Sequence, residues 1–371
     1  MRTIKKPFAY SVFIFSAGLS CVTSFAADTT SQAVANTTQT NSTEQGLLYQ
    51  IPRLIDATPT LFPEQSEEST VPATSETENS TWPDRQQKNI REWADRTAHK
   101  IDNWFGDTDP NRPASATLRV ILDNTWNKHD GYELNPRIRG KIKLPTLENK
   151  VSVVFGDDSL DNELANNVAI TNENPASPKD KNINNKKTRE DNGSIALRWS
   201  EFSKKLPFET DFDLGIRSGS DIYARLKASK DWQLDNDFGF HAEQIYRYGI
   251  DSKNYLRTNF ELTQSKPNHP ILSNQLSLTY ADAQDDDLSW DNFSFRQHQF
   301  FKGNSFSYGL YTGGYYNDSD LRLNSYGPFV SWRQPVLREW FFVQGDLNYL
   351  NDHRENRSHF IGALVRLEAL F

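Results

Sequence analysis

The last twelve residues, Phe360-Ile361-Gly362-Ala363-Leu364-Val365-Arg366-Leu367-Glu368-Ala369-Leu370-Phe371, alternate in a regular way. Counting back in twos from Phe371, every residue is apolar as far as Ile361, whereas the intervening positions include Gly362, Arg366 and Glu368. A period of two with one apolar face is typical of a β-strand that separates an apolar from an aqueous environment. The pattern therefore predicts a final strand that runs to the end of the chain.

Residues 1–26 have the pattern of a secretory signal. A basic head precedes an apolar run over residues 8 to 22, and Ser24 and Ala26 are small residues at the positions that a signal peptidase reads. The run is shorter than the roughly 20 residues that a membrane-spanning helix needs. Lipidation of Cys21 is the weaker alternative, because the preceding Gly18-Leu19-Ser20 does not begin with leucine as the usual lipidation motif does.

The two ends of the chain together resemble the porin-like superfamily of bacterial outer-membrane β-barrels, although no specific family is identified. The resemblance covers the leader and residues 115–371, and it implies an antiparallel up-and-down barrel in the outer membrane of a Gram-negative cell. It also implies contact with membrane lipid and lipopolysaccharide, and a terminal strand ending at Phe371 that the barrel assembly machinery reads as a signal.

Composition agrees with a barrel and excludes several other classes of protein. Mean hydropathy is −0.72, and a chain this polar enters a membrane only as a barrel, in which half of each strand faces inward and every backbone group is paired. Cleavage of the leader would remove the only Cys and the only Met, and it would leave 38 of the 41 basic residues against 49 acidic ones. The mature chain then has no thiol chemistry, and its acidity argues against nucleic acid as a partner.

The segment before the barrel divides into a tail and a helix. Residues 27–82 are rich in Ser, Thr and Gln and are predicted to be disordered. Residues 83–106 read as one amphipathic helix, with Pro83 in its first turn and Gly106 at its end. The apolar residues that recur at spacings of three and four are Ile90, Trp93, Ala94, Ala98, Ile101, Trp104 and Phe105.

From Ser115 onward the period is two, which predicts about fourteen strands, with a range of 12 to 16. Their predicted bounds are 116–127, 131–144, 150–156, 193–202, 207–218, 221–231, 236–249, 254–265, 273–282, 289–301, 305–317, 321–334, 339–350 and 357–371. Compact turns are expected on the periplasmic side and longer polar loops outside the cell, as in outer-membrane barrels. A secreted β-sandwich would also alternate, but the strand number and the terminal Phe favour a barrel.

Aromatic residues cluster near the predicted strand ends, as expected for belts at two membrane interfaces. Those expected at the external ends are Trp126, Tyr132, Tyr248, Tyr280, Trp290, Tyr316 and Tyr349, and those expected at the periplasmic ends are Phe202, Phe208, Trp232, Phe301, Trp332, Trp340 and Phe371.

The polar face of each strand, taken as inward, supplies candidate lumen-lining residues. These are Arg137, Arg139, Lys141, Lys143, Arg198, Glu209, Asp211, Asp213, Arg225 and Lys227. The acidic residues of 207–218 alternate with basic residues of the neighbouring strands, which predicts cross-strand ion pairs. The four cations of 131–144 lie about 7 Å apart and face only Asp123 on the preceding strand. The negative charge that balances these cations could come from a loop carboxylate, from the acidic face of the helix, or from a passing anionic solute.

Further residues expected to point inward are Arg119, Asp123, Arg217, Glu243, Arg247, Arg257, Glu261, Arg296, Asp346, Arg366 and Glu368. His241 and His298 are also assigned to the inner face, but neither has an obvious Ser and acidic partner at the same depth. The acidic runs at 157–158 and 285–287, and the pair Asp318 and Asp320, lack the spacing of a dedicated metal loop. The sequence therefore predicts no catalytic residues, no metal site and no cofactor, and the protein is not expected to be an enzyme.

Two functions remain open from the sequence. The first is a channel or transport barrel, with anionic solutes as candidate substrates, that helix 83–105 plugs or gates. In that arrangement the carboxylates of Glu92, Asp95 and Asp102 would face the basic strand. The second is a structural or assembly barrel whose helix binds a periplasmic protein. Both place the N-terminal segment in the periplasm.

Overall fold

A computed structural model describes ten segments of the chain. These are residues 81–106, 113–147, 151–156, 193–200, 207–267, 269–282, 288–300, 303–317, 320–353 and 356–371. All of them belong to one compact unit, Gln50–Phe371. The predicted signal peptide and the predicted disorder up to residue 80 lie outside the described residues.

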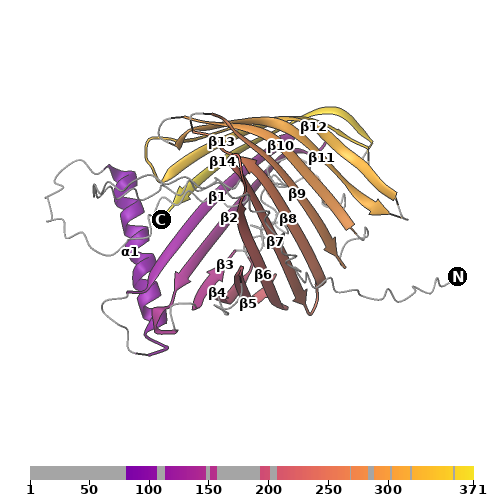
Figure 1. The fold of residues 1–371 in the computed structure, drawn as a ribbon. Coiled ribbons are helices and arrows are strands. Elements are labelled where there is room, and N and C mark those ends of the chain that lie inside the picture. Colours follow the sequence, from indigo (N-terminus) through magenta and orange to yellow (C-terminus); the bar gives the residue numbers. More distant parts are fainter. Residues whose placement is uncertain are drawn as a thin grey trace, which may run out of the picture. The chain divides into compact units, whose positions relative to one another are not determined.

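Fourteen strands form a closed antiparallel barrel in which each strand pairs with its neighbours in sequence and β1 pairs with β14 (Figure 1). They are β1 (Ser115–Asn127), β2 (Gly131–Lys143), β3 (Val151–Phe155), β4 (Ile195–Ser200), β5 (Glu209–Arg217), β6 (Asp221–Gln233), β7 (Phe238–Gly249), β8 (Lys253–Gln264), β9 (Ile271–Ala281), β10 (Leu288–Gln299), β11 (Ser305–Asn317), β12 (Asp320–Pro335), β13 (Phe341–Asp352) and β14 (Arg357–Leu370). The predicted fold class is confirmed, and each strand end lies within two residues of its expected position.

The barrel closes where the first and last strands meet. Phe371 continues the pairing of β14 beyond Leu370, because its backbone N–H donates to Leu118 O at 2.8 Å and its carbonyl accepts from Leu118 N at 3.1 Å. We call the end of the barrel that holds Ser115 and Phe371 the terminal rim, and the other end the opposite rim.

The outer face of the wall is mostly apolar, although on β9 and β10 it also exposes Asn274, Ser294 and Arg296. Large side chains such as Ile138, Leu310 and Ile361 are about half exposed, at 47%, 59% and 52%. Exposed aromatic residues lie near both rims. Those near the opposite rim are Trp126, Tyr132, Tyr248, Tyr316 and Tyr349, and those near the terminal rim are Phe208, Trp232 and Trp332. Phe202 and Phe301 lie outside the described residues. Phe371 differs from its predicted role in a belt, because its ring is only 9% exposed and lies 6.2 Å from that of Trp340.

The connections agree only in part with the predicted asymmetry between short and long loops. Most turns at the opposite rim are short, for example 128–130, 218–220 and 250–252, whereas connections such as 144–150 and 201–208 at the terminal rim are longer. The connections 156–194 and 282–287 are the longer ones at the opposite rim, as predicted. Polar runs taken for loops are partly strand, as at Asp320–Leu323, where cross-strand pairing continues beyond the apolar part of the wall. Polarity at these positions therefore does not mark a turn.

One helix, α1 (Trp82–Asp102), precedes the barrel. It begins at Thr81, whose backbone N–H and hydroxyl both donate to Asp84 Oδ2, at 3.2 and 2.7 Å. The helix ends earlier than predicted, so that Trp104 and Phe105 lie in a turn beyond it. Ala98 and Ile101 pack with Ala114, Ala116, Ile142 and Leu144 of the wall near the terminal rim. Within the described residues, no helix is long and apolar enough to cross a membrane.

The inner wall as candidate functional site

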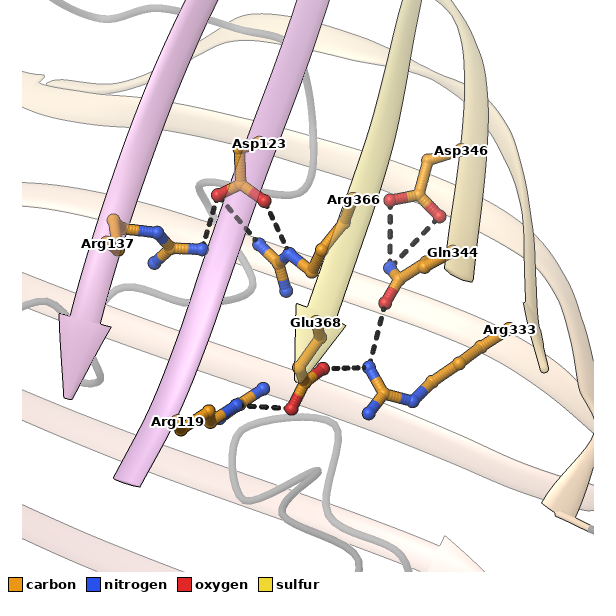
Figure 2. Close-up of polar contacts among 8 residues, drawn as sticks. All are labelled: Arg119, Asp123, Arg137, Arg333, Gln344, Asp346, Arg366 and Glu368. Carbon is orange, nitrogen blue, oxygen red and sulfur yellow. Dashed lines mark hydrogen bonds and ion pairs between the residues drawn. The ribbon is translucent and has the colours of Figure 1, made fainter. Parts of the chain in front are cut away.

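The inner face of β1, β2 and β14 is held by a carboxylate that two arginines share. Asp123 forms ion pairs with Arg137 of β2 and with Arg366 of β14, the latter with Nε 2.6 Å from Oδ1 (Figure 2). Both guanidinium groups are almost fully buried, at 1% and 2% side-chain exposure. Because charges with so little contact to water need close partners, this triad ties three adjacent strands together across the closure of the barrel.

A second triad lies closer to the terminal rim. Glu368 of β14 pairs with Arg119 of β1 and with Arg333 of β12, whose Nη1 is 2.7 Å from Oε2. Arg333 also reaches Gln344 of β13, and the Gln344 amide donates to Asp346 at 2.9 Å (Figure 2). We call the eight residues of Figure 2 the closure network. It extends from β2 through β1, β14 and β13 to β12.

The third triad lies in the region where the sequence predicts a ladder of ion pairs. Asp213 of β5 accepts two bonds from Arg198 of β4, both 2.8 Å, and one from Arg225 of β6 at 3.1 Å. The register places Asp213 directly opposite each arginine. Lys227 Nζ is also 2.6 Å from Glu243 Oε2. The predicted cross-strand ion pairs are therefore present here, although Glu209 is exposed and Asp211 is only half-buried.

The four cations of β2 have unequal environments. Arg137 and Arg139 are buried, Lys141 is half-buried and Lys143 is exposed. Arg137 pairs with Asp123, the one acidic residue that the sequence offered on β1.

The helix carboxylates make different contacts from those expected of a plug. Asp95 Oδ1 accepts from the backbone N–H of Ala116, and Asp102 Oδ1 accepts from that of Thr146, each at 3.2 Å. These N–H groups lie at the start of β1 and in the connection after β2, where the strand ladder leaves donors open.

Not every strand places its polar face inward. On β10 the buried residues are Phe293, Phe295 and Gln297, and the two Phe side chains pack with Tyr311, Leu350 and Phe360 inside the wall. Arg296 and His298 consequently lie on the other face, so their predicted inward orientation is wrong. Polarity assigned the face correctly only where the interior is charged, whereas this sector of the interior is a packed aromatic cluster.

Among the described residues, no side chains are arranged as a catalytic dyad or triad. His241 Nδ1 lies 2.9 Å from Asp231 Oδ1, and the His298 ring stacks on Tyr308 with centroids 5.8 Å apart. Within the segments that the structure describes, no group of three metal-binding side chains occurs. The acidic runs at 157–158 and 285–287, and Asp318, lie outside those segments.

No family model and no curated protein matches this chain. Solved structures with a similar fold include OprB of Pseudomonas putida at low pH, with 11% identity and a TM-score of 0.39 over 70% of this chain and 92% of that one. Salmonella typhi OmpF in complex with daunomycin has 8% identity and a TM-score of 0.41, over 70% and 98%. Pseudomonas aeruginosa OccK5 (OpdH) has 6% identity and a TM-score of 0.37, also over 70% and 98%. These similarities are low and add nothing to what the residues themselves show.

A membrane-spanning β-barrel needs a closed wall without free edges, an apolar outer face and aromatic side chains at two interfaces. The fourteen strands, with exposed residues such as Leu310 at mid-wall and Trp126 and Trp332 near the two rims, meet each of these requirements. The described part of the chain folds as an antiparallel transmembrane β-barrel.

Proposed function

We propose that this protein is a channel or transport barrel of the outer membrane, with a preference for anionic solutes. The observation that carries the proposal is the set of three triads on the inner wall. Each of Asp123, Glu368 and Asp213 is shared by two arginines, so each group of three residues has a net charge of +1. Rings of fixed cationic charge on a pore wall favour anions.

The strand number is consistent with passage through the barrel. Eight-stranded barrels are filled by their own side chains, whereas barrels of 16 to 18 strands leave an aqueous channel. Fourteen strands lie nearer to the second group. The aromatic cluster around Phe293 and Phe295 occupies the sector of β10 to β14. Any aqueous path would pass beside this cluster, along the strands that carry the three triads, which are β1, β2, β4, β5, β6, β12 and β14.

The orientation in the membrane is part of the proposal. The leader predicts export, and α1 and the start of β1 lie at the terminal rim, so a periplasmic N-terminal segment requires this rim to face the periplasm. The contacts of α1 favour a helix held beside the wall over a luminal plug. Its apolar partners Ala116 and Ile142 belong to the outward parity of β1 and β2, opposite Arg119 and Arg137.

Ion selectivity in a planar bilayer tests this function. The triple variant Arg137→Gln, Arg198→Gln and Arg333→Gln leaves each carboxylate one arginine and removes the net charge of all three triads. The reversal potential in a KCl gradient is expected to move toward cation selectivity. A matched control is Lys266→Gln, an exposed residue outside the strands. Heat-modifiable migration on a gel shows that the barrel is folded. If folded wild-type protein gives no conductance steps, the channel function is rejected.

The alternative function is a structural or assembly barrel that binds a periplasmic protein through α1. It is favoured by the exposed Trp82 and Trp93 side chains of the helix, which the barrel does not cover. In that case wild-type protein gives no conductance, and crosslinkers placed on the helix capture a single periplasmic partner that is lost when α1 is deleted.

A further inference from the structure

The helix separates its charges by sign. Its acidic side chains Asp84, Asp95 and Asp102 turn toward the barrel, where Asp84 pairs with Arg338 and the other two accept from backbone N–H groups of the wall. The exposed positions of the helix include Arg85, Lys88, Arg96 and Lys100 against the single acid Glu92. The solvent side of α1 is therefore strongly basic.

Tryptophans lie on the same side of the helix as the basic residues. Trp82 and Trp93 are eleven residues apart, which is about three turns of helix and returns to the same face. They are 67% and 59% exposed, and Trp104 just beyond the helix is 80% exposed. The opposite side of α1 holds the buried Ala94 and Ala98. The barrel therefore covers the small residues and leaves the largest apolar ones uncovered.

We infer that this basic, Trp-bearing face of α1 binds the surface of an anionic phospholipid bilayer beside the barrel. Tryptophan prefers the boundary between headgroups and acyl chains, and a helix with aromatic and basic residues on one face lies in that boundary, attracted to anionic lipid. Each basic residue near such a surface adds to this attraction. The ligands are thus lipid phosphate groups and the adjoining acyl chains.

Continuity with the lipid-facing wall supports a bilayer over a protein partner. The first turn of the helix contacts Arg338, in the turn that also carries Trp340. The helix then passes the start of β1 and reaches Thr146 after β2. It thus follows the terminal rim, near which the wall exposes Trp332 and Phe208. A membrane that covers the apolar wall up to these aromatic residues would also meet a helix packed on the outward-facing Ala116 and Ile142. The inference rests on the barrel spanning a membrane and is independent of channel activity.

Spin-label accessibility in the full-length protein tests this binding. Asn89 is exposed and lies beside Trp82 and Trp93 on the helix, so Asn89→Cys with Cys21→Ser gives a single labelled position. The protein is placed in nanodiscs of phosphatidylcholine with an equal amount of phosphatidylglycerol. Collision rates with oxygen and with a water-soluble nickel chelate then report depth. Labels at Leu310→Cys, on the outer wall, and Lys266→Cys, outside the strands, calibrate lipid and water.

The expected nickel collision rate at position 89 is several-fold lower than at position 266, with an oxygen rate approaching that at position 310. Trp82→Ser with Trp93→Ser should restore the water-like nickel rate, whereas the matched pair Gln86→Ser with Thr97→Ser should not. Arg85→Gln, Arg96→Gln and Lys100→Gln together should remove the difference between these nanodiscs and pure phosphatidylcholine.

Three outcomes would overturn the inference. If the label at position 89 has the nickel collision rate of position 266 in otherwise wild-type protein, the helix face does not bind lipid and would instead bind a soluble protein. Dipolar broadening between labels would assign it to a second copy of the chain. An unchanged nickel rate in the double Trp variant would show that the tryptophans do not insert. Heat-modifiable migration of each sample shows that the barrel is folded, so failure of helix binding is distinguishable from failure of the barrel.

Discussion

Three carboxylates on the inner wall are each shared by two arginines, and they differ in how far apart their partners lie in sequence. Asp213 and its arginines come from consecutive strands, whereas Asp123 and Arg366 are 243 residues apart. The nearby pairs could be predicted from the alternation of charges along 193–231. The distant ones could not, because they depend on the register between β1 and β14, which places Asp123 opposite Arg366.

Replacing Glu368 by Gln should destabilise the barrel. The side chain is fully buried and it balances two guanidinium groups, so its loss leaves both charges uncompensated. Removal of one partner from a buried ion pair typically costs about 3 kcal/mol or more. Urea unfolding in detergent micelles, followed by tryptophan fluorescence, measures the change. Glu209→Gln makes the same substitution at an exposed inner-wall site and should leave the unfolding midpoint unchanged. Equal midpoints for the two variants would contradict a structural role for this triad.

The attachment of α1 through Asp84 should depend on pH. Hydrogen bonds from Arg338, and then from Thr81, hold the pKa of the Asp84 carboxyl well below its usual value of 3.8. A carboxyl with a lowered pKa stabilises the docked helix above that usual value and loses this contribution as pH falls below it. The mobility of a spin label at Asn89 should therefore rise below about pH 4. Asp84→Asn should show this high mobility at neutral pH and lack the acid step. An identical titration in both proteins would show that the ion pair does not hold the helix.

Phe371 takes part in closing the barrel between β1 and β14. Phe371 makes two backbone hydrogen bonds to Leu118, and its ring is buried near Trp340. This environment makes it a part of the wall, whereas an exposed interface anchor was expected. The signal for its backbone role was present in the sequence, because the alternation continues to the final residue.

Deleting Phe371 should lower the fraction of assembled, heat-modifiable protein several-fold, because β1 loses its last partner and Trp340 loses its neighbour. Phe371→Leu keeps the backbone bonds and an apolar side chain, and it should assemble better than the deletion. Fractionation of cell envelopes followed by gels of unboiled samples gives both values. Normal assembly of the deletion would show that the seam closes without this residue.

Deleting α1, residues 81–106, should leave single-channel conductance unchanged, because the helix contacts outward-facing residues such as Ala116 and Ile142. The same deletion uncovers those residues and should lower the unfolding midpoint. Planar-bilayer recordings and urea unfolding of one preparation provide the two measurements. A marked rise in conductance would instead support the hypothesis, left open by the sequence, that the helix plugs the lumen.

For the molecule as a whole, the sequence predicts the strands of the barrel wall better than it predicts the packing of side chains inside the barrel. A period of two locates every strand within two residues, because successive side chains of a strand face opposite sides of the wall. The interior is not uniform. A charged sector and an aromatic cluster share it, so the polar-inward rule fails at Arg296 and His298 beside Phe293 and Phe295. Loop lengths were also misjudged, because paired strands extend into polar sequence at the opposite rim.

The closure network has a consequence for a chain that is cut before β14. Arg366 and Glu368 lie within six residues of the end of the chain, and they are the seam partners of Asp123 and Arg119. A chain truncated before β14 therefore carries an open edge on which an acid and an arginine have each lost a seam partner. Such an edge leaves backbone N–H and C=O groups without partners, which is unfavourable in lipid. The first strand can therefore form all of these ion pairs only when β14 is present beside it.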